Sequence, residues 1–213
     1  ISAHNWSFVT DAAYSTAYES AAVRTGLHSG PKWRTHVALW VATNCSKLEG
    51  DFIELGVGRG WMSSAIIRAL DWDSLDKSLW LFDRFEDNDV DPVTGEQLSS
   101  RNSKGTYSPS LSATANSLVG ASNVHLVAGT LPKSLMHRPQ GPIAFIHADL
   151  NAAIPEAESV ENLWPSLVPG GMILFDDFAY RGYSPQYEST LRLARRLGTS
   201  VLALPTGQGL AIK

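Results

Sequence analysis

An acid and three alternate glycines end an apolar segment near residue 55, and a helical pattern follows directly. Residues 51–61 read DFIELGVGRGW, which places Glu54 before Gly56, Gly58 and Gly60. Glycines let the backbone turn tightly and approach a ligand, and the N-terminus of a helix offers free N–H groups to an anion. The segment therefore predicts a strand, a ligand-binding turn and a helix that together hold a negatively charged group.

The spacing of these glycines distinguishes two kinds of nucleotide cofactor. Dinucleotide-binding enzymes use G-x-G-x-x-G, and the third glycine of that pattern would fall on Trp61, which would block close packing of helix on strand. The carboxylate of Glu54 would repel the negatively charged pyrophosphate of a dinucleotide, but it would attract the cationic amino and sulfonium end of S-adenosylmethionine. We therefore expect S-adenosylmethionine. An NAD-dependent oxidoreductase is the alternative, although the sequence lacks a Tyr-x-x-x-Lys pair.

Two further strand ends are expected at the same nucleoside. The apolar run 79–82 ends in Asp83, and an acid at this position of a doubly wound sheet can accept both ribose hydroxyls. Gly129 and Thr130 follow the third predicted strand, where the edge of an adenine would lie. A solvated loop acid is the alternative interpretation of Asp83.

Three carboxylates follow the fourth and fifth predicted strands. Asp149 comes after residues 143–147, and Asp176 and Asp177 come after residues 172–175. Parallel strands end at one edge of a sheet, so these side chains should converge there and repel one another unless a cation holds them. Hard oxygen ligands select Mg²⁺, Ca²⁺ or Mn²⁺, and such an ion could activate and orient an acceptor hydroxyl. In the alternative, one aspartate caps a helix and the other faces water.

The elements that position these residues follow from hydrophobic patterning. From residue 51 onward, short apolar runs alternate with helical patterns, which predicts an α/β fold with a doubly wound, mostly parallel sheet of seven strands. The turn-rich residues 205–208 predict that the last two strands form an antiparallel hairpin at the sheet edge. The predicted strands are residues 52–55, 79–82, 124–127, 143–147, 172–175, 200–204 and 209–212.

The chain divides into two expected parts. Residues 1–49 show helical spacing of apolar residues and form an N-terminal helical extension, and residues 50–213 form the donor-binding domain. Residues 86–109 are polar and longer than an ordinary connection. They are predicted to be an inserted loop, either a lid over the substrate or a surface insertion.

Composition limits the remaining classes of function. The 213 residues are 44% hydrophobic and 18% charged, with a net charge of -4, so neither a nucleic-acid-coating surface nor a polybasic membrane patch is expected. No apolar run approaches the roughly 20 residues of a membrane-spanning helix. The single cysteine, Cys45, excludes an internal disulfide and a cysteine-rich zinc module. We expect a cytoplasmic protein that acts on a small-molecule acceptor. Two copies of the protein could form a homodimer through their N-terminal helices.

Four segments together resemble class I S-adenosylmethionine-dependent methyltransferases: residues 50–61, 81–86, Asp149 and residues 167–178. More narrowly, they are similar to the macrocin O-methyltransferase (TylF/MycF-like) family, whose members methylate sugar hydroxyls with Mg²⁺. The resemblance implies an O-methyltransferase whose metal ligands are Asp149, Asp176 and Asp177. The residues expected to bind the donor are Glu54, Gly56, Gly58, Gly60, Trp61, Asp83, Arg84, Gly129, Thr130 and Asp149.

The chain departs from that family at two places. The family reads D-x-D-x-Y-x-S after the fourth strand, whereas residues 149–153 read DLNAA and lack the second acid and the tyrosine. No histidine lies between Asp83 and Val124, where the family has its general base. His147 is the best remaining candidate base, since it lies two residues before Asp149 on the same face of a strand, ahead of His125 and His137. A non-catalytic donor-binding domain is a further alternative.

Overall fold

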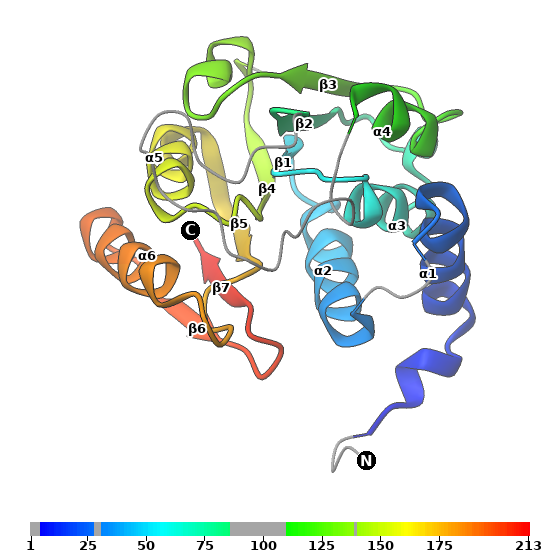
Figure 1. The fold of residues 1–213 in the computed structure, drawn as a ribbon, viewed down its shortest axis with the longest axis horizontal. Helices are drawn as coiled ribbons and strands as arrows, with labels where there is room; N and C mark the ends of the chain where they lie inside the picture. Colours follow the sequence, from blue (N-terminus) through cyan, green and yellow to red (C-terminus); the bar gives the residue numbers. More distant parts are fainter. Residues whose placement is uncertain (1–4, 28–30, 86–109, 139) are drawn as a thin grey trace.

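The computed structural model describes residues 5–27, 31–85, 110–138 and 140–213. Its centre is a seven-stranded sheet in the order β3-β2-β1-β4-β5-β7-β6 (Figure 1). The first five strands pair in parallel, and β7 runs antiparallel to both β5 and β6. The strands are β1 (Asp51–Leu55), β2 (Leu79–Asp83), β3 (Val124–Ala128), β4 (Ile143–Ala148), β5 (Leu167–Phe175), β6 (Val201–Ala203) and β7 (Gly209–Ile212).

This arrangement confirms the predicted fold, including the hairpin at the sheet edge. The strand order reverses between β1 and β4, and ligands of open α/β sheets bind beyond the carboxyl ends of the strands at such a point. β5 begins five residues earlier than expected, at Leu167, which pairs with Ile143 before the register shifts. The predicted inserted loop at 86–109 lies outside the described residues.

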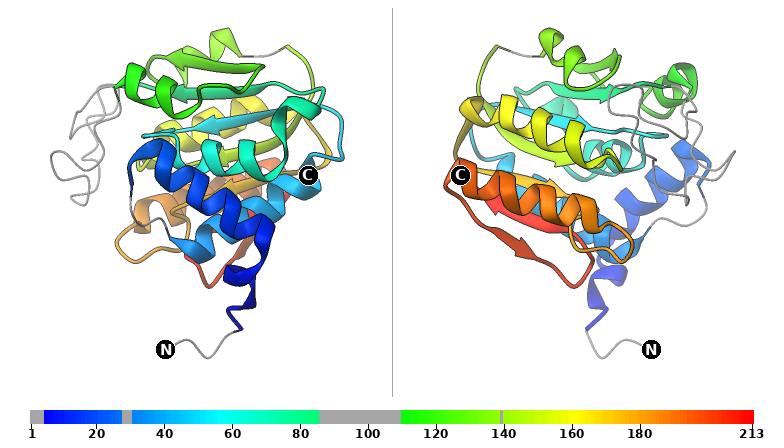
Figure 2. Two further views of the ribbon diagram at one scale, coloured as in Figure 1. Left: turned by 90° about the vertical axis from the view of Figure 1, so that its right-hand side faces the viewer. Right: turned by 60° about the vertical axis from the view of Figure 1, so that its left-hand side comes forward.

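Helices cover both faces of the sheet (Figure 2). α1, α2, α3 and α4 lie on one side, and α5 and α6 lie on the other. His137, one of the lesser candidate bases, ends a short 3₁₀ helix, Lys133–His137, after β3. The α-helices are α1 (Ala12–Thr25), α2 (Lys32–Cys45), α3 (Trp61–Ala69), α4 (Leu111–Ser117), α5 (Ala153–Leu163) and α6 (Ser184–Leu197).

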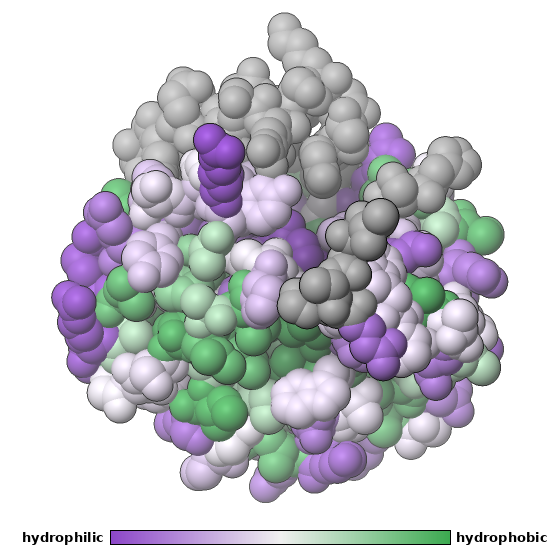
Figure 3. All heavy atoms as spheres, turned by 90° about the horizontal axis from the view of Figure 1, so that it is seen from below, coloured by the Kyte–Doolittle hydropathy of each residue, from purple (hydrophilic) through white to green (hydrophobic). Residues whose placement is uncertain are grey.

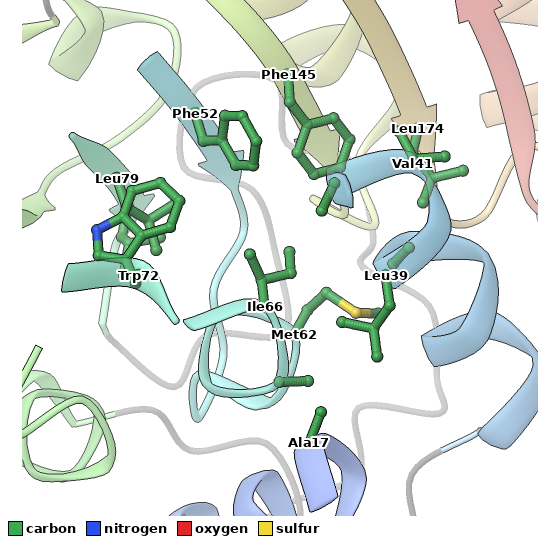
Figure 4. Packing of buried hydrophobic residues seen from close by; sticks show 14 of the residues in the cluster. Ala17, Leu39, Val41, Phe52, Met62, Ile66, Trp72, Leu79, Phe145 and Leu174 are labelled. Carbon is green, nitrogen blue, oxygen red and sulfur yellow. The ribbon is translucent and has the colours of Figure 1, made fainter. Parts of the chain in front are cut away.

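Alternation along the strands divides the core into two clusters. Phe52 and Phe145 point toward α1, α2 and α3, and their rings meet edge to face at 5.3 Å (Figure 4). Ile53 and Ile146, one residue further along, point toward α5 and α6. Ala17 of α1 belongs to the same cluster as Phe52, so the N-terminal helices share a core with the sheet. A division of the chain after residue 49 stays a prediction.

Large apolar side chains remain exposed where helices leave the sheet uncovered. Leu202 on β6 is 62% exposed and Ile212 on β7 is 51% exposed. Leu202 pairs with Leu210, which packs on the α1–α3 side of the core, so both exposed residues face that side. Figure 3 shows hydrophobic residues gathered in the middle and on the left of the underside. Among the described residues, no helix has the length and apolar character to cross a membrane.

Candidate functional site

The three glycines of the turn after β1 serve different purposes. All three have positive φ. A Cβ on Gly56 would lie 2.0 Å from the carbonyl oxygen of Asp149, and one on Gly60 would lie 2.7 Å from Ser117 Oγ. A Cβ on Gly58 would meet nothing within 4 Å. Packing therefore requires glycine at the outer two positions, and only Gly58 faces open space where a ligand could approach.

Asp83 holds this turn in place. Its Oδ2 accepts hydrogen bonds from the N–H groups of Val57 (2.7 Å) and Gly58 (2.9 Å), and its Oδ1 accepts one from Phe85 (3.0 Å). A carboxylate offers about four acceptor sites, so little capacity is left for other donors in this arrangement. The acid at the end of β2 thus fixes the glycine-rich turn, beside the position predicted for a ribose.

The remaining expected donor-binding residues surround this turn. The Trp61 indole donates to Thr35 Oγ1 at 3.1 Å and so faces α2. The N–H of Gly129 donates to the carbonyl of Asp83 at 2.9 Å, and the carbonyl of Thr130 accepts from Ser134. Arg84 directly follows β2 and is half-buried. The structure therefore brings the ends of β1, β2 and β3 together, as the sequence predicted.

Glu54 is buried between two side chains. It is 4% exposed, its Oε2 accepts a hydrogen bond from the Ser63 hydroxyl, and its Oε1 lies 3.1 Å from His147 Nδ1. Glu54 and His147 are also direct neighbours in the pairing of β1 with β4. Both carboxylate oxygens therefore have partners inside the protein.

The predicted carboxylate cluster is present at the ends of β4 and β5. One carboxylate oxygen from each of Asp149, Asp176 and Asp177 lies within 4.8 Å of the others. Asp176 is 6% exposed and Asp177 is 4% exposed. Strand alternation places Asp149 and Asp176 on the side of the sheet covered by α2, as it does Glu54 and His147. We refer to Asp149, Asp176 and Asp177 as the acidic cluster.

Two residues that the sequence did not indicate complete this cluster. Arg34, in the first turn of α2, places Nη2 2.5 Å from Asp176 Oδ2 and 2.9 Å from Asp177 Oδ1, and it also donates to the Asp176 carbonyl. Gln208, in the β6–β7 turn, is fully buried and donates to Asp176 Oδ1 at 2.7 Å. The guanidinium of Arg34 thus supplies part of the positive charge that the three carboxylates need.

His147 lies between the glycine-rich turn and the acidic cluster. Its ring is 2% exposed, and Nε2, 3.6 Å from Asp176 Oδ1, has no hydrogen-bond partner among the described residues. Burial lowers the pKa of His147, but Asp176 and Glu54 outweigh burial and raise this pKa to about 10. Without a bound ion, the two carboxylates therefore favour the protonated imidazole, and the expected role of His147 as general base stays a prediction.

Mutual repulsion governs ionisation within the acidic cluster. Burial, and then the charges of Asp176 and Asp177, raise the pKa of Asp149 well above its ordinary value. Burial and Asp176 raise the pKa of Asp177 to about 6. Burial also opposes ionisation of Asp176, but His147 and Arg34 outweigh it and lower the pKa of this carboxyl. The cluster is therefore short of positive charge, and its hard oxygen atoms fit Mg²⁺, Ca²⁺ or Mn²⁺.

Comparisons with known proteins identify the family and the fold of the chain. A family model described as a methyltransferase domain matches residues 53–178. The solved O-methyltransferase NovP is 17% identical, with a TM-score of 0.74 over 98% of this chain and 99% of its own. The calicheamicin methyltransferase CalS11 is 15% identical, with a TM-score of 0.64 over 93% and 91%.

A third similar solved structure is that of a methyltransferase with bound SAH. The SAH-bound methyltransferase PaMTH1 of Podospora anserina is 14% identical to this chain, with a TM-score of 0.61 over 96% of this chain and 91% of its own. No curated protein sequence matches the chain at a significant level. These structures share the fold described above, and the family match covers β1 to the end of β5. The chain belongs to the methyltransferase domain family and is an enzyme of that family.

Proposed function

We propose that the protein transfers the methyl group of S-adenosylmethionine to a hydroxyl of a small molecule, with a divalent cation held by the acidic cluster. The observation that carries this proposal is the contact between the two halves of the site. Gly56 lies against the backbone of Asp149, whose N–H also donates to the Leu55 carbonyl at 2.8 Å. A donor on the glycine-rich turn would therefore have its methyl group beside the acidic cluster.

Donor binding would use the open side of the glycine-rich turn. Gly58 leaves room for the methionine part, and Asp83 would exchange one of its present N–H partners for a ribose hydroxyl. The rest of the donor-binding site would be formed by Trp61, Arg84, Gly129 and Thr130. The SAH-bound state named for PaMTH1 supports a donor of this type.

The chain's own residues would orient the reactants. Asp149, Asp176 and Asp177 would hold the cation, which when bound lowers the pKa of an acceptor hydroxyl. In the transfer the acceptor oxygen forms a bond to the methyl carbon, the carbon–sulfur bond breaks, S-adenosylhomocysteine leaves and the hydroxyl proton passes to solvent. Collinear placement of oxygen, carbon and sulfur supplies most of the acceleration. His147 is buried between Glu54 and Asp176, with a ring nitrogen facing each carboxylate, and would act as a positioning residue.

A sugar hydroxyl is the acceptor that we propose, as in the TylF/MycF-like family. A CalS11 structure is described as a TDP-rhamnose 3'-O-methyltransferase, which supports an acceptor of this class. Trp33 precedes Arg34 in sequence and packs on Phe8, with ring centroids 4.5 Å apart, and this aromatic pair would line the apolar face of a sugar ring. In place of the N-terminal helices that the sequence suggested, we propose that two copies pair through the exposed apolar surface that includes Leu202 and Ile212.

Methyl transfer to a panel of sugars and nucleotide sugars would test the proposal. The assay follows tritium from labelled S-adenosylmethionine, with Mg²⁺ and with EDTA, in the wild type, Asp149→Asn and the exposed control Glu158→Gln. We expect transfer that needs Mg²⁺, falls at least a hundredfold in Asp149→Asn and is unchanged in the control. Donor binding in calorimetry without any transfer or metal effect would favour the non-catalytic alternative, and NADH-linked absorbance changes would favour the oxidoreductase.

A further inference from the structure

Arg34 is the basic side chain that contacts the acidic cluster most closely in the described part of the chain. A single nitrogen, Nη2, approaches carboxylate oxygens of Asp176 and Asp177 at 2.5 and 2.9 Å. The side chain is only 16% exposed. Its Nε is buried without a hydrogen-bond partner among the described residues, so the guanidinium is held by its charge contacts at one end rather than by a full set of hydrogen bonds.

The charges around Arg34 do not balance. The facing acids are Glu54, Asp149, Asp176 and Asp177, and the basic groups that reach them are Arg34 and His147. A fifth acid, Glu156, also interacts with this group, but burial raises its pKa to about 8 and keeps it uncharged at neutral pH. With all of these groups ionised, the site carries two unmatched negative charges, which equals the charge of one divalent cation. His147 Nε2 is a separate observation, since it is buried, points at Asp176 from 3.6 Å and has no hydrogen-bond partner among the described residues, so a polar atom beside the cluster is still without a partner.

We propose that Arg34 sets the affinity of the acidic cluster for a divalent cation, by neutralising Asp176 and Asp177 in the ion-free protein and yielding their oxygens when the ion binds. This inference rests on the proposed metal site. An oxygen lone pair that accepts an N–H bond from Arg34 is not free for a metal, and the guanidinium charge repels the incoming ion. Removal of Arg34 should therefore destabilise the ion-free protein while tightening ion binding.

The test is a Mn²⁺ titration by calorimetry, after treatment with EDTA and desalting, with no donor or acceptor present. We expect Arg34→Gln to lower the Kd for Mn²⁺ at least tenfold relative to the wild type. Arg34→Lys keeps the charge but loses the planar fork and should give an intermediate Kd. The matched control is Arg196→Gln, because Arg196 also pairs with a carboxylate, Glu161, but is exposed and distant from the cluster. The control should leave the Kd unchanged.

Thermal melting provides a second readout that does not depend on activity. Without metal, Arg34→Gln should melt below the wild type, and saturating Mn²⁺ should raise its melting temperature more than it raises that of the wild type. Weaker or unchanged Mn²⁺ binding in both Arg34 variants, or no binding to any variant, overturns the inference. If Arg34→Gln does not fold, the Kd of Arg34→Lys decides the question by itself. Failure of the methyltransferase proposal would instead show as absent S-adenosylhomocysteine binding, which these titrations do not require.

Discussion

At the scale of single residues, the site is organised by buried charge. Glu54, His147, Asp176 and Arg34 form a continuous series of ion pairs from the glycine-rich turn to the first turn of α2. Each of these groups would be costly to bury alone, and each has an opposite charge beside it. Removing any one member leaves each of its neighbours buried with one opposite charge fewer.

Glu156 lies outside this series and makes stability depend on pH. Its carboxylate is buried and accepts a hydrogen bond from the Leu150 N–H at 3.2 Å, and burial raises its pKa to about 8. In the unfolded chain the group loses its proton near pH 4.5, so between about pH 4.5 and 8 only the folded protein keeps it. This group therefore lowers the free energy of unfolding as pH rises, by up to about 1.4 kcal/mol per pH unit.

Glu156→Gln should remove the fall in the free energy of unfolding that Glu156 causes as pH rises. Glutamine keeps an acceptor for the Leu150 N–H but does not ionise. Urea unfolding at pH 5.5 and pH 8.5 should show a smaller drop in stability between these pH values for the variant than for the wild type. Glu158→Gln, on an exposed position of the same helix, should retain the wild-type drop. An equal drop in all three proteins would contradict the assignment.

The glycines of the turn offer a paired test. Gly56→Ala would place a Cβ 2.0 Å from the Asp149 carbonyl oxygen, whereas Gly58→Ala meets no atom within 4 Å. Both variants carry the cost of a positive φ, about 1–2 kcal/mol. We expect Gly56→Ala to lose several kcal/mol of stability or fail to fold, and Gly58→Ala to fold but bind S-adenosylhomocysteine more weakly. Similar melting temperatures for the two variants would argue against a packing role for Gly56.

At the scale of elements, helix ends determine what reaches the sheet edge. α2 brings Arg34 to the acidic cluster from its first turn, and Thr35, one residue later, accepts a hydrogen bond from the Trp61 indole at the start of α3. α1 packs across α3. The helix begins where Asp11 accepts a hydrogen bond from the Tyr14 N–H at 2.9 Å, and it ends where Gly26 adopts a left-handed conformation. The site thus depends on helices that precede the first strand.

The cap of α1 should contribute measurably to this arrangement. Asp11→Ala removes the acceptor of the Tyr14 N–H and should lower stability by about 1 kcal/mol, whereas Asp11→Asn should lose much less. Chemical denaturation of the three proteins would measure the difference. A loss of equal size in Asp11→Asn would mean that the charge, rather than the cap, is responsible.

At the scale of the whole molecule, the β6–β7 edge of the sheet exposes large apolar side chains that a second chain could bury. Leu202 and Ile212 are more than half exposed on one face of the β6–β7 hairpin, and β6 is the last strand of the sheet. Edge strands with exposed apolar side chains favour pairing with another chain. This surface carries the proposed homodimer.

Leu202→Lys should weaken such a dimer. A charged side chain buried between two copies would lack a partner, so light scattering after gel filtration should show a lower mass than for the wild type at the same concentration. Met136→Lys is a matched control, because Met136 is 75% exposed but lies in the 3₁₀ helix Lys133–His137, outside both the β6–β7 hairpin and the N-terminal helices. A wild type that is monomeric at all concentrations would remove the dimer proposal.

The sequence by itself determined the sheet and the positions at its edge. Apolar runs and turn residues are local signals, so the strands, the hairpin and the convergence of Asp149 with Asp176 and Asp177 could be predicted. Alternation along β4 likewise placed His147 on the face of Asp149. These features need only the chain near each residue and the rule that parallel strands end together.

Only the tertiary structure decided which groups meet that edge. Arg34 lies 142 residues from Asp176, and Gln208 lies 32 residues from it, in a turn whose residue types indicated no more than a change of direction. The sequence predicted a bound metal ion beside the carboxylates. It did not indicate that helix packing would also place the guanidinium of Arg34, from α2, against two of them. The orientation of a helix on a sheet results from the fit of many side chains, as for Ala17, Phe52 and Phe145 in one cluster, and no local pattern encodes that fit.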